Sequence, residues 1–134
     1  MSVLPDTLMV EEWRDPVVAA HGFSANSRYV RWIWSAILGP TATLTLILLT
    51  DLLESHDIVE VRSEVLARTL GVKRDVLARG VDRLRRFGFL RAGASGVAIR
   101  THVGPVPESK LDRLSAYGRV LHDRLVAERH REVA

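Results

Sequence analysis

Arginines carry the clearest chemical potential in this chain, and they gather in its middle. Between residues 62 and 91 three acidic residues stand against nine basic ones: Arg62, Arg68, Lys73, Arg74, Arg79, Arg83, Arg85, Arg86 and Arg91. This segment has a formal charge of +6, while the whole chain has +3. A planar guanidinium donates paired hydrogen bonds to phosphate oxygens, so such a segment can bind a polyanion. A solvated surface is the alternative, because 17 of the 19 basic residues are arginine and the composition itself favours this residue.

Other residue types that carry catalysis or bind metals form no recognisable group. The chain has no cysteine, which excludes disulfides, thiolate zinc sites and a cysteine nucleophile, and fits a reducing cytoplasm. The histidines lack the spacing of metal ligands, since even His122 and His130 on one expected helix lie two turns apart. No serine or carboxylate pair stands in a recognisable catalytic context. We therefore expect a cytoplasmic protein that is not an enzyme and has no metal or cofactor.

The spacing of apolar residues predicts two short helices that position these arginines. The first begins at Ser63, a favourable N-cap residue, and ends before Gly71. Its apolar face consists of Val65, Leu66 and Leu70. The second runs from about residue 73 to 87 and ends at Gly88, and its inner face consists of Leu77, Gly80, Val81 and Leu84. Two helices joined by a tight turn, with the second basic on its outer side, form a helix-turn-helix.

Strand signals lie on both sides of this pair of helices. Residues 58–61 are a short strand candidate or an extended link. Residues 89–92 and 97–103 predict two strands joined by a turn at Gly93–Gly96, because apolar and polar residues alternate in the second of them. A helix-turn-helix followed by a β-hairpin is a winged helix. The expected fold class is therefore mainly α with a small β-hairpin wing, flanked by N- and C-terminal helices.

The remaining sequence supplies the two flanking parts. Residues 1–39 form an N-terminal extension, loose over residues 1–24 with one helical turn, and then an aromatic helix whose inner stripe is Tyr29, Trp32, Ile33, Ala36 and Ile37. Residues 40–104 form the winged helix-turn-helix domain, which begins with an almost wholly apolar helix. Residues 105–134 carry a C-terminal helix from about 108 to 132. Gly39-Pro40 divides the uncharged run 32–50 into two short buried helices, so we expect no membrane span.

The stretch LARTLGVKRDVLARGVDRLRRFGFL resembles the winged helix-turn-helix of bacterial transcriptional regulators. The shared features are a leucine-alanine pair, leucine-glycine-valine at the turn, and a basic helix that ends in glycine before the wing. The resemblance covers about residues 40–103, and the wider sequence is similar to small actinobacterial proteins of unassigned role that carry such a domain. Lys73 departs from the family pattern, in which Ser or Thr often caps the second helix, and Asp82 places a negative charge on the outer face.

The resemblance implies how the arginines would contact double-stranded DNA. The second helix would enter the major groove and direct its outward residues at base edges, with Arg74 the leading candidate for guanine. These residues are Lys73, Arg74, Ala78 and Arg79. Arg62 and Arg68 would bind phosphates, and Arg83 lies further round the helix. The wing would contribute Arg91, Ser95 and Arg100, whereas Arg86 is expected to pair with Asp82 at i,i+4.

Aromatic and leucine residues outside the basic segment predict a homodimer. Trp32 and Trp34 point to different sides of their helix, so one of them should meet a second subunit or the C-terminal helix. A leucine stripe on the C-terminal helix could pair across a two-fold axis or pack on the domain, and it consists of Leu111, Leu114, Leu121 and Leu125.

The expected function is a DNA-binding transcriptional regulator. A protein–protein adaptor without significant DNA affinity is the alternative, because winged helices also serve as interaction modules. A role in replication or partition of a mobile element would use the same DNA chemistry. No pocket for a small-molecule effector is visible in the sequence.

Overall fold

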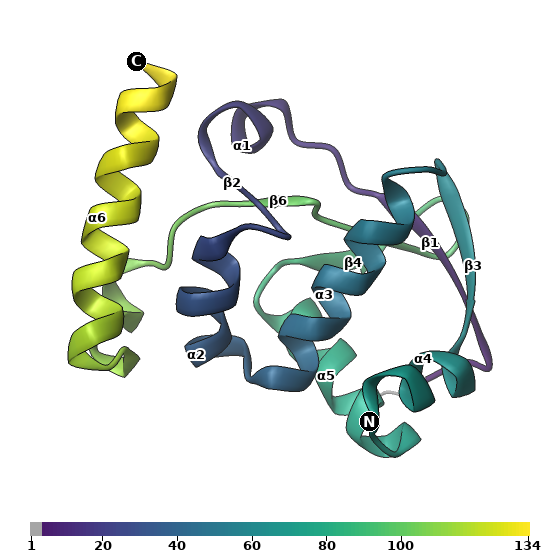
Figure 1. Cartoon of the computed structure of the whole chain (residues 1–134). Coiled ribbons are helices and arrows are strands. Elements are labelled where there is room, and N and C mark those ends of the chain that lie inside the picture. Colours follow the sequence, from purple (N-terminus) through teal and green to yellow (C-terminus); the bar gives the residue numbers. More distant parts are fainter. Residues whose placement is uncertain (1–3) are drawn as a thin grey trace.

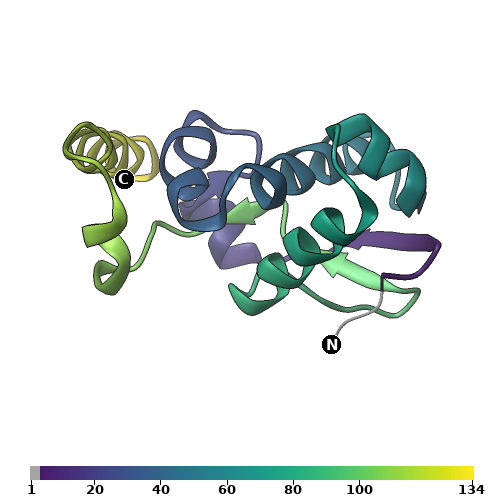
Figure 2. The same ribbon diagram turned by 90° about the horizontal axis from the view of Figure 1, so that it is seen from below.

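The computed structural model describes residues 4–134 and shows a mixed α/β protein. A four-stranded sheet and the helices α3 (Pro40–Leu53), α4 (Ser63–Leu70) and α5 (Arg74–Arg86) form one end of the molecule, and α6 (Ala116–Val133) lies at the other (Figures 1 and 2). The expected class, mainly α with a small β-hairpin, agrees in general terms with a structure that is 58% helical, and the hairpin is part of a larger, four-stranded sheet. Within the part of the chain that the structure describes, no helix combines the length and the apolar character needed to cross a membrane.

The larger sheet has the strand order β3–β1–β5–β4, with β1 (Thr7–Glu12) inside it. β1 runs antiparallel to β3 (Ile58–Arg62) and parallel to β5 (Val97–Ile99), and β4 (Leu90–Ala92) forms an antiparallel hairpin with β5. The strand candidate at residues 58–61 and the hairpin are thus present. The strand predicted over residues 97–103 is divided, because β6 (His102–Val103) leaves the hairpin and pairs with β2 (Phe23–Ser24) in a second sheet.

The prediction of a loose N-terminus with a helical turn is wrong, since these residues supply β1. Leu8 and Val10 are buried on one side of β1 and alternate with more exposed residues, which is the period of a strand with one covered face. Both edges of β1 are paired, so that Val10 lies opposite Val59 on one side and Val97 on the other. The N-terminal extension therefore completes the sheet of the domain expected at residues 40–104.

The two helices predicted on either side of Gly71 are present as α4 and α5. Gly71 has a φ of 73°, the left-handed conformation that glycine adopts at low cost after a helix. The inner face of α5 is as predicted, with Leu77, Gly80, Val81 and Leu84 all buried. The capping role predicted for Ser63 is wrong, because it is the first helical residue and its buried hydroxyl donates to the Pro5 carbonyl oxygen. Val65 is exposed, since Ala67 takes the inner position.

A π-helical stretch, η1 (Val30–Trp34), interrupts the predicted aromatic helix and leads directly into α2 (Ser35–Leu38). A π turn holds more residues than an α turn, so it rotates the following residues relative to the inner face. As a result Trp32 and Ala36 are exposed, and Trp34 is buried with its indole Nε1–H donating to the Gly104 carbonyl oxygen over 2.9 Å. Gly39, with a φ of 82°, then separates α2 from α3, as predicted.

The C-terminal helix predicted over residues 108–132 is divided in two. A 3₁₀ helix, η2 (Glu108–Arg113), comes first, and α6 begins only after Ser115. The Ser115 Oγ accepts a hydrogen bond from the Gly118 N–H over 3.0 Å and so acts as the N-cap of α6. The leucine stripe is therefore spread over two elements with different directions.

Polar contacts of His122 and Arg129 hold α6 against the rest of the chain. The Tyr29 hydroxyl lies 2.8 Å from Nδ1 of His122 on α6. The Arg129 Nε–H donates over 2.7 Å to the carbonyl oxygen of Gly22, which follows α1 (Pro16–His21). Because Tyr29 and His122 are buried, this end of the molecule is a packed interface within the chain.

Candidate nucleic-acid interface

Helix α5 turns its apolar side to α3 and a basic side to solvent. At Gly80 the two helices approach closely, since a Cβ atom there would lie 3.0 Å from Thr41 Cγ2 and 3.4 Å from the Ala42 nitrogen. Exposed basic residues along α5 and the turn before it are Lys73, Arg74, Arg79, Arg83, Arg85 and Arg86. Ala78, predicted among the outward residues, is half-buried and packs against the core, so it lies at the margin of this surface.

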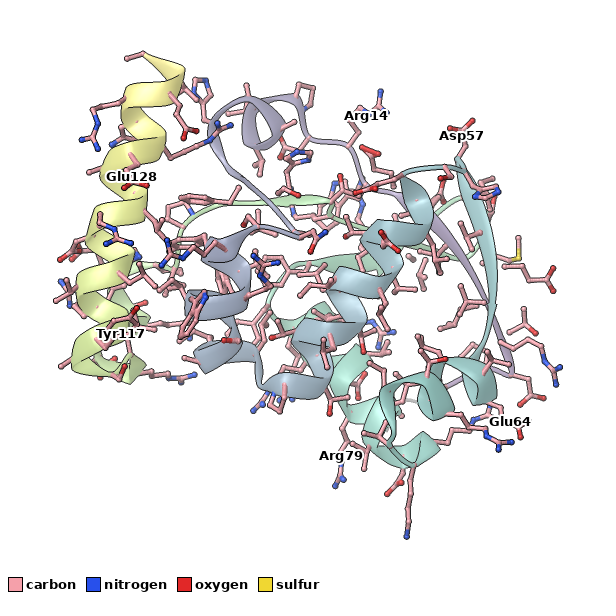
Figure 3. The ribbon with its side chains drawn as sticks, in the orientation of Figure 1. Arg14, Asp57, Glu64, Arg79, Tyr117 and Glu128 are labelled. Carbon is pink, nitrogen blue, oxygen red and sulfur yellow. The ribbon has the colours of Figure 1, made fainter. Side chains whose placement is uncertain are left out.

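Arg79 and Arg86 are the arginines of α5 whose side chains make neither an ion pair nor a hydrogen bond within residues 4–134. Figure 3 shows Arg79 projecting from the helix into open space. The predicted pair between Asp82 and Arg86 is wrong, because Asp82 Oδ1 lies 2.9 Å from Arg85 Nη1 at spacing i,i+3. Both spacings bring side chains together on a helix, and here the nearer arginine holds the carboxylate. Arg86 is therefore available to an anion.

A groove of about 320 Å³ runs between the outer side of α5 and the junction of α2 with α3. We call it the arginine groove, because Arg79, Arg83 and Arg86 line it from α5. Its other wall is formed by residues 38–42. Arg83 spans the two walls, with Nη1 donating to the Leu38 carbonyl oxygen over 3.3 Å.

Arg74, the leading candidate for guanine, is held by the N-terminal segment. Its Nη2 lies 2.7 Å from Asp6 Oδ1 and donates over 2.8 Å to the Leu4 carbonyl oxygen. The prediction that Arg74 contacts guanine stays a prediction, and such a contact would compete with this ion pair, because the segment before β1 lies against the start of α5. Lys73, one residue earlier, is exposed, and its side chain has no ion pair or hydrogen bond within residues 4–134.

The arginines of the β4–β5 hairpin stack on a residue that the sequence did not single out for DNA binding. Trp13 lies between Arg91 and Arg100, whose guanidinium carbons are 4.0 and 3.8 Å from its ring centroid. Arg100 also donates its Nε–H to the Gly88 carbonyl oxygen over 3.0 Å and lies 3.2 Å from Asp15 Oδ2. Arg100, which was predicted to bind DNA from the wing, is thus half-buried and bonded within the chain, whereas Arg91 is exposed.

Two carboxylates reduce the positive charge of this hairpin. Hydrogen bonds from the Val18 N–H and from Arg100 hold the pKa of the Asp15 carboxyl below its ordinary value. At the hairpin turn Ser95 is exposed, and its N–H donates to Glu11 Oε1 over 3.2 Å. The hairpin is therefore a weaker anion surface than the outer side of α5.

The remaining residues predicted to bind DNA lie on the other side of the turn. Arg62 ends β3 and Arg68 lies in the last turn of α4. Both are exposed, and neither side chain has an ion pair or hydrogen bond within residues 4–134. Across the same residues no group of three His, Asp or Glu side chains is placed to hold a metal ion.

The residues predicted to form a dimer mostly pack inside the chain. Trp34, Leu111 and Leu121 are buried, so they cannot serve a second subunit in this conformation, and Leu114 and Leu125 are half-buried. Trp32 is 53% exposed, and its ring centroid lies 6.0 Å from that of Tyr117 on α6. One tryptophan thus meets the C-terminal helix, which was one of the two expected outcomes.

Asp6 and Trp13 are the members of this surface that the sequence did not assign to it. No local pattern links Asp6 to Arg74 or Trp13 to the hairpin, because both contacts depend on the pairing of β1. Asp15 caps α1, and the Asp15-Pro16 pair is a local sign of that helix start.

Comparison of the chain with family models, with curated proteins and with solved structures found no match.

Proposed function

We propose that this protein is a winged helix-turn-helix protein that binds double-stranded DNA through the outer side of α5. The proposal rests on Lys73, Arg79 and Arg86, which are exposed and have no carboxylate partner within residues 4–134. Such residues reach phosphates without first breaking an ion pair. The chain order of α4, tight turn, α5 and β4–β5 hairpin supports the winged-helix assignment, with β1 as an added strand between β3 and the hairpin.

Binding of this kind gains most of its free energy from phosphates. Lys73 and Arg86, towards the two ends of α5, displace counterions from the DNA backbone, as do Arg62 and Arg68 beyond the turn. Arg79 lies between them in the sequence and projects from the helix into open space (Figure 3). Its planar fork suits the O6 and N7 atoms of guanine, so it replaces Arg74 as the leading base contact.

The biological role that we propose is regulation of transcription in the cytoplasm, by a homodimer. Trp32 is the member of the predicted dimer set that is still exposed, and with Tyr117 it offers an aromatic surface away from α5. Replication or partition of a mobile element would use the same DNA contacts.

A protein–protein adaptor is the second candidate function. It is favoured by Asp6 and Asp15, which already occupy Arg74 and Arg100, and by a cluster of exposed apolar residues near the start of α6. Trp32, Tyr117 and Val120 are 53%, 62% and 69% exposed. An adaptor of this kind would leave the arginines of α5 as a solvated surface.

The test is fluorescence anisotropy of a labelled random-sequence duplex at low and at physiological salt. We expect micromolar binding that weakens steeply with salt, and loss of that binding in Lys73→Ala/Arg79→Ala. The matched control is Arg113→Ala/Arg131→Ala, which removes the same charge from two exposed residues in η2 and α6. Absence of binding at low salt by the folded wild type would reject DNA binding and favour the adaptor.

A further inference from the structure

The arginine groove shares Arg79 with the part of α5 that the helix-turn-helix pattern directs at bases, but it extends beyond that part. Arg83 and Arg86 lie in the last turn and a half of α5, and the opposite wall comes from the end of α2 and the start of α3. Neither of these two elements belongs to the helix-turn-helix. We infer that the groove binds a phosphate group, namely a backbone phosphate when the protein is on duplex DNA. This inference rests on the proposed function for its source of phosphate.

The charges of the groove favour an anion. Three guanidinium groups line it, and Asp82 is the carboxylate among its lining residues. Asp82 is bound to Arg85 over 2.9 Å, so its charge is already matched by an arginine outside the lining set. The lining therefore keeps a positive excess that a phosphate would neutralise, and guanidinium–phosphate pairs are among the stronger hydrogen bonds of proteins.

Arg83 is held in position for such a contact. Its bond to the Leu38 carbonyl oxygen uses one N–H of a group that has five donors. Gly39 borders the groove, and a Cβ atom there would lie 3.3 Å from Arg83 Nη1. Glycine at residue 39 thus leaves room for the guanidinium group, which is anchored before any ligand arrives and loses less side-chain entropy on binding.

The size and walls of the groove suit a small, strongly acidic group. Its volume of about 320 Å³ is at the lower end of small-molecule sites. α3 begins at the wall of the groove without a side-chain cap, and because Pro40 has no N–H, Thr41 and Ala42 supply the backbone N–H groups of this first turn that could add to the donors of the arginines. The contact would extend the DNA footprint from α5 to residues 39–41.

The experiment compares salt dependence in wild type and in Arg83→Gln/Arg86→Gln with the same random-sequence duplex. Each lost phosphate contact lowers the slope of log K against log salt by about 0.9, so we expect a slope smaller by about 1 and an affinity lower by roughly tenfold. Arg113→Gln/Arg131→Gln, with the same loss of charge elsewhere, should keep the wild-type slope. An unchanged slope and affinity in the groove variant would overturn the inference.

Two further arms separate this inference from the proposed function. Amide NMR with inorganic phosphate should give saturable shifts at Thr41 and Ala42 that Arg83→Gln/Arg86→Gln abolishes. If the wild type shows these shifts but does not bind duplex DNA, the groove binds phosphate and DNA is refuted as the source of that phosphate. If the wild type shows no shifts, the phosphate site itself is refuted. Arg86→Gln alone, at a residue without a partner in the described chain, replaces the double variant if loss of the Arg83–Leu38 bond unfolds the protein.

Discussion

Tyr29→Phe should destabilise the protein strongly, although it removes a single oxygen atom. The Tyr29 side chain is 1% exposed and stacks on Phe23 with ring centroids 4.0 Å apart, so a phenylalanine ring fits the same space. The hydroxyl accepts from the Val106 N–H over 2.8 Å and lies 2.8 Å from His122 Nδ1. Because the hydroxyl already accepts one bond, we assign its proton to the bond with His122, whose own proton is then on Nε2.

The size of the effect follows from the two groups that lose their partner. Val106 and His122 are 3% and 7% exposed, so water does not readily replace the hydroxyl. An unsatisfied buried polar group costs about 1–3 kcal/mol, and two of them give a loss of ~2–6 kcal/mol in the free energy of unfolding. A domain of this size has roughly 5–15 kcal/mol in total, so the loss is a large fraction of its stability.

Urea denaturation followed by circular dichroism measures this loss. Tyr117→Phe is the matched control, because Tyr117 is 62% exposed and should change stability by less than about 0.5 kcal/mol. Tyr29→Phe/His122→Leu removes both partners of one bond and should be less destabilised than the sum of its single variants. Equal stability of Tyr29→Phe and Tyr117→Phe would refute the argument that this hydroxyl joins α6 to the body.

Three further outcomes are expected. Burial lowers the pKa of His122 from its ordinary value of 6.5. As the pH drops, the unfolded chain therefore takes up this proton before the folded protein does, and stability falls below about pH 6.5. The urea midpoints at pH 8 and pH 5.5 should differ less in His122→Leu than in the wild type. Asp6→Asn removes the ion-pair partner of Arg74 and should raise the affinity for duplex DNA, measured by anisotropy, by up to about fivefold. An equal gain on adding Asp6→Asn to Arg74→Ala would show that release of Arg74 is not the reason. Gly71→Ala, at a φ of 73° with no atom within 4 Å of its Cβ, should lose about 1 kcal/mol in thermal unfolding, whereas Gly104→Ala, with equal space and no positive φ, should not.

The helices around the turn could be predicted because their signals are local. Gly71 and Gly88 mark helix ends, and both have positive φ values in the structure. The inner stripe of α5 repeats every three to four residues, and all four of its members are buried. The π stretch at Val30–Trp34 has no comparable local signal, so the buried tryptophan of that helix could not be chosen from spacing alone.

The candidate site was predicted in part for the same reason. The exposure of Lys73 and Arg79 follows from their place opposite the apolar stripe. The hydrogen bonds of Arg74 to Leu4 and of Arg100 to Asp15 do not follow from any such pattern, because these partners lie 70 and 85 residues away along the chain. β1 brings both partners into place, and its short run of alternating residues also suited the start of a helix.

The position of β1 also determines when the molecule can be completed during its synthesis. β1 leaves the ribosome before both of its neighbours, and β5, which pairs with its second edge, follows only after α5. The helices can form as they emerge, since they depend on nearby residues, but the sheet stays open until Val97–Ile99 are free to pair. A fragment that begins after Glu12 would leave β3 and β5 with unpaired edges, which readily join strands of other chains. The smallest piece of this protein that folds without aggregating must therefore include its first strand.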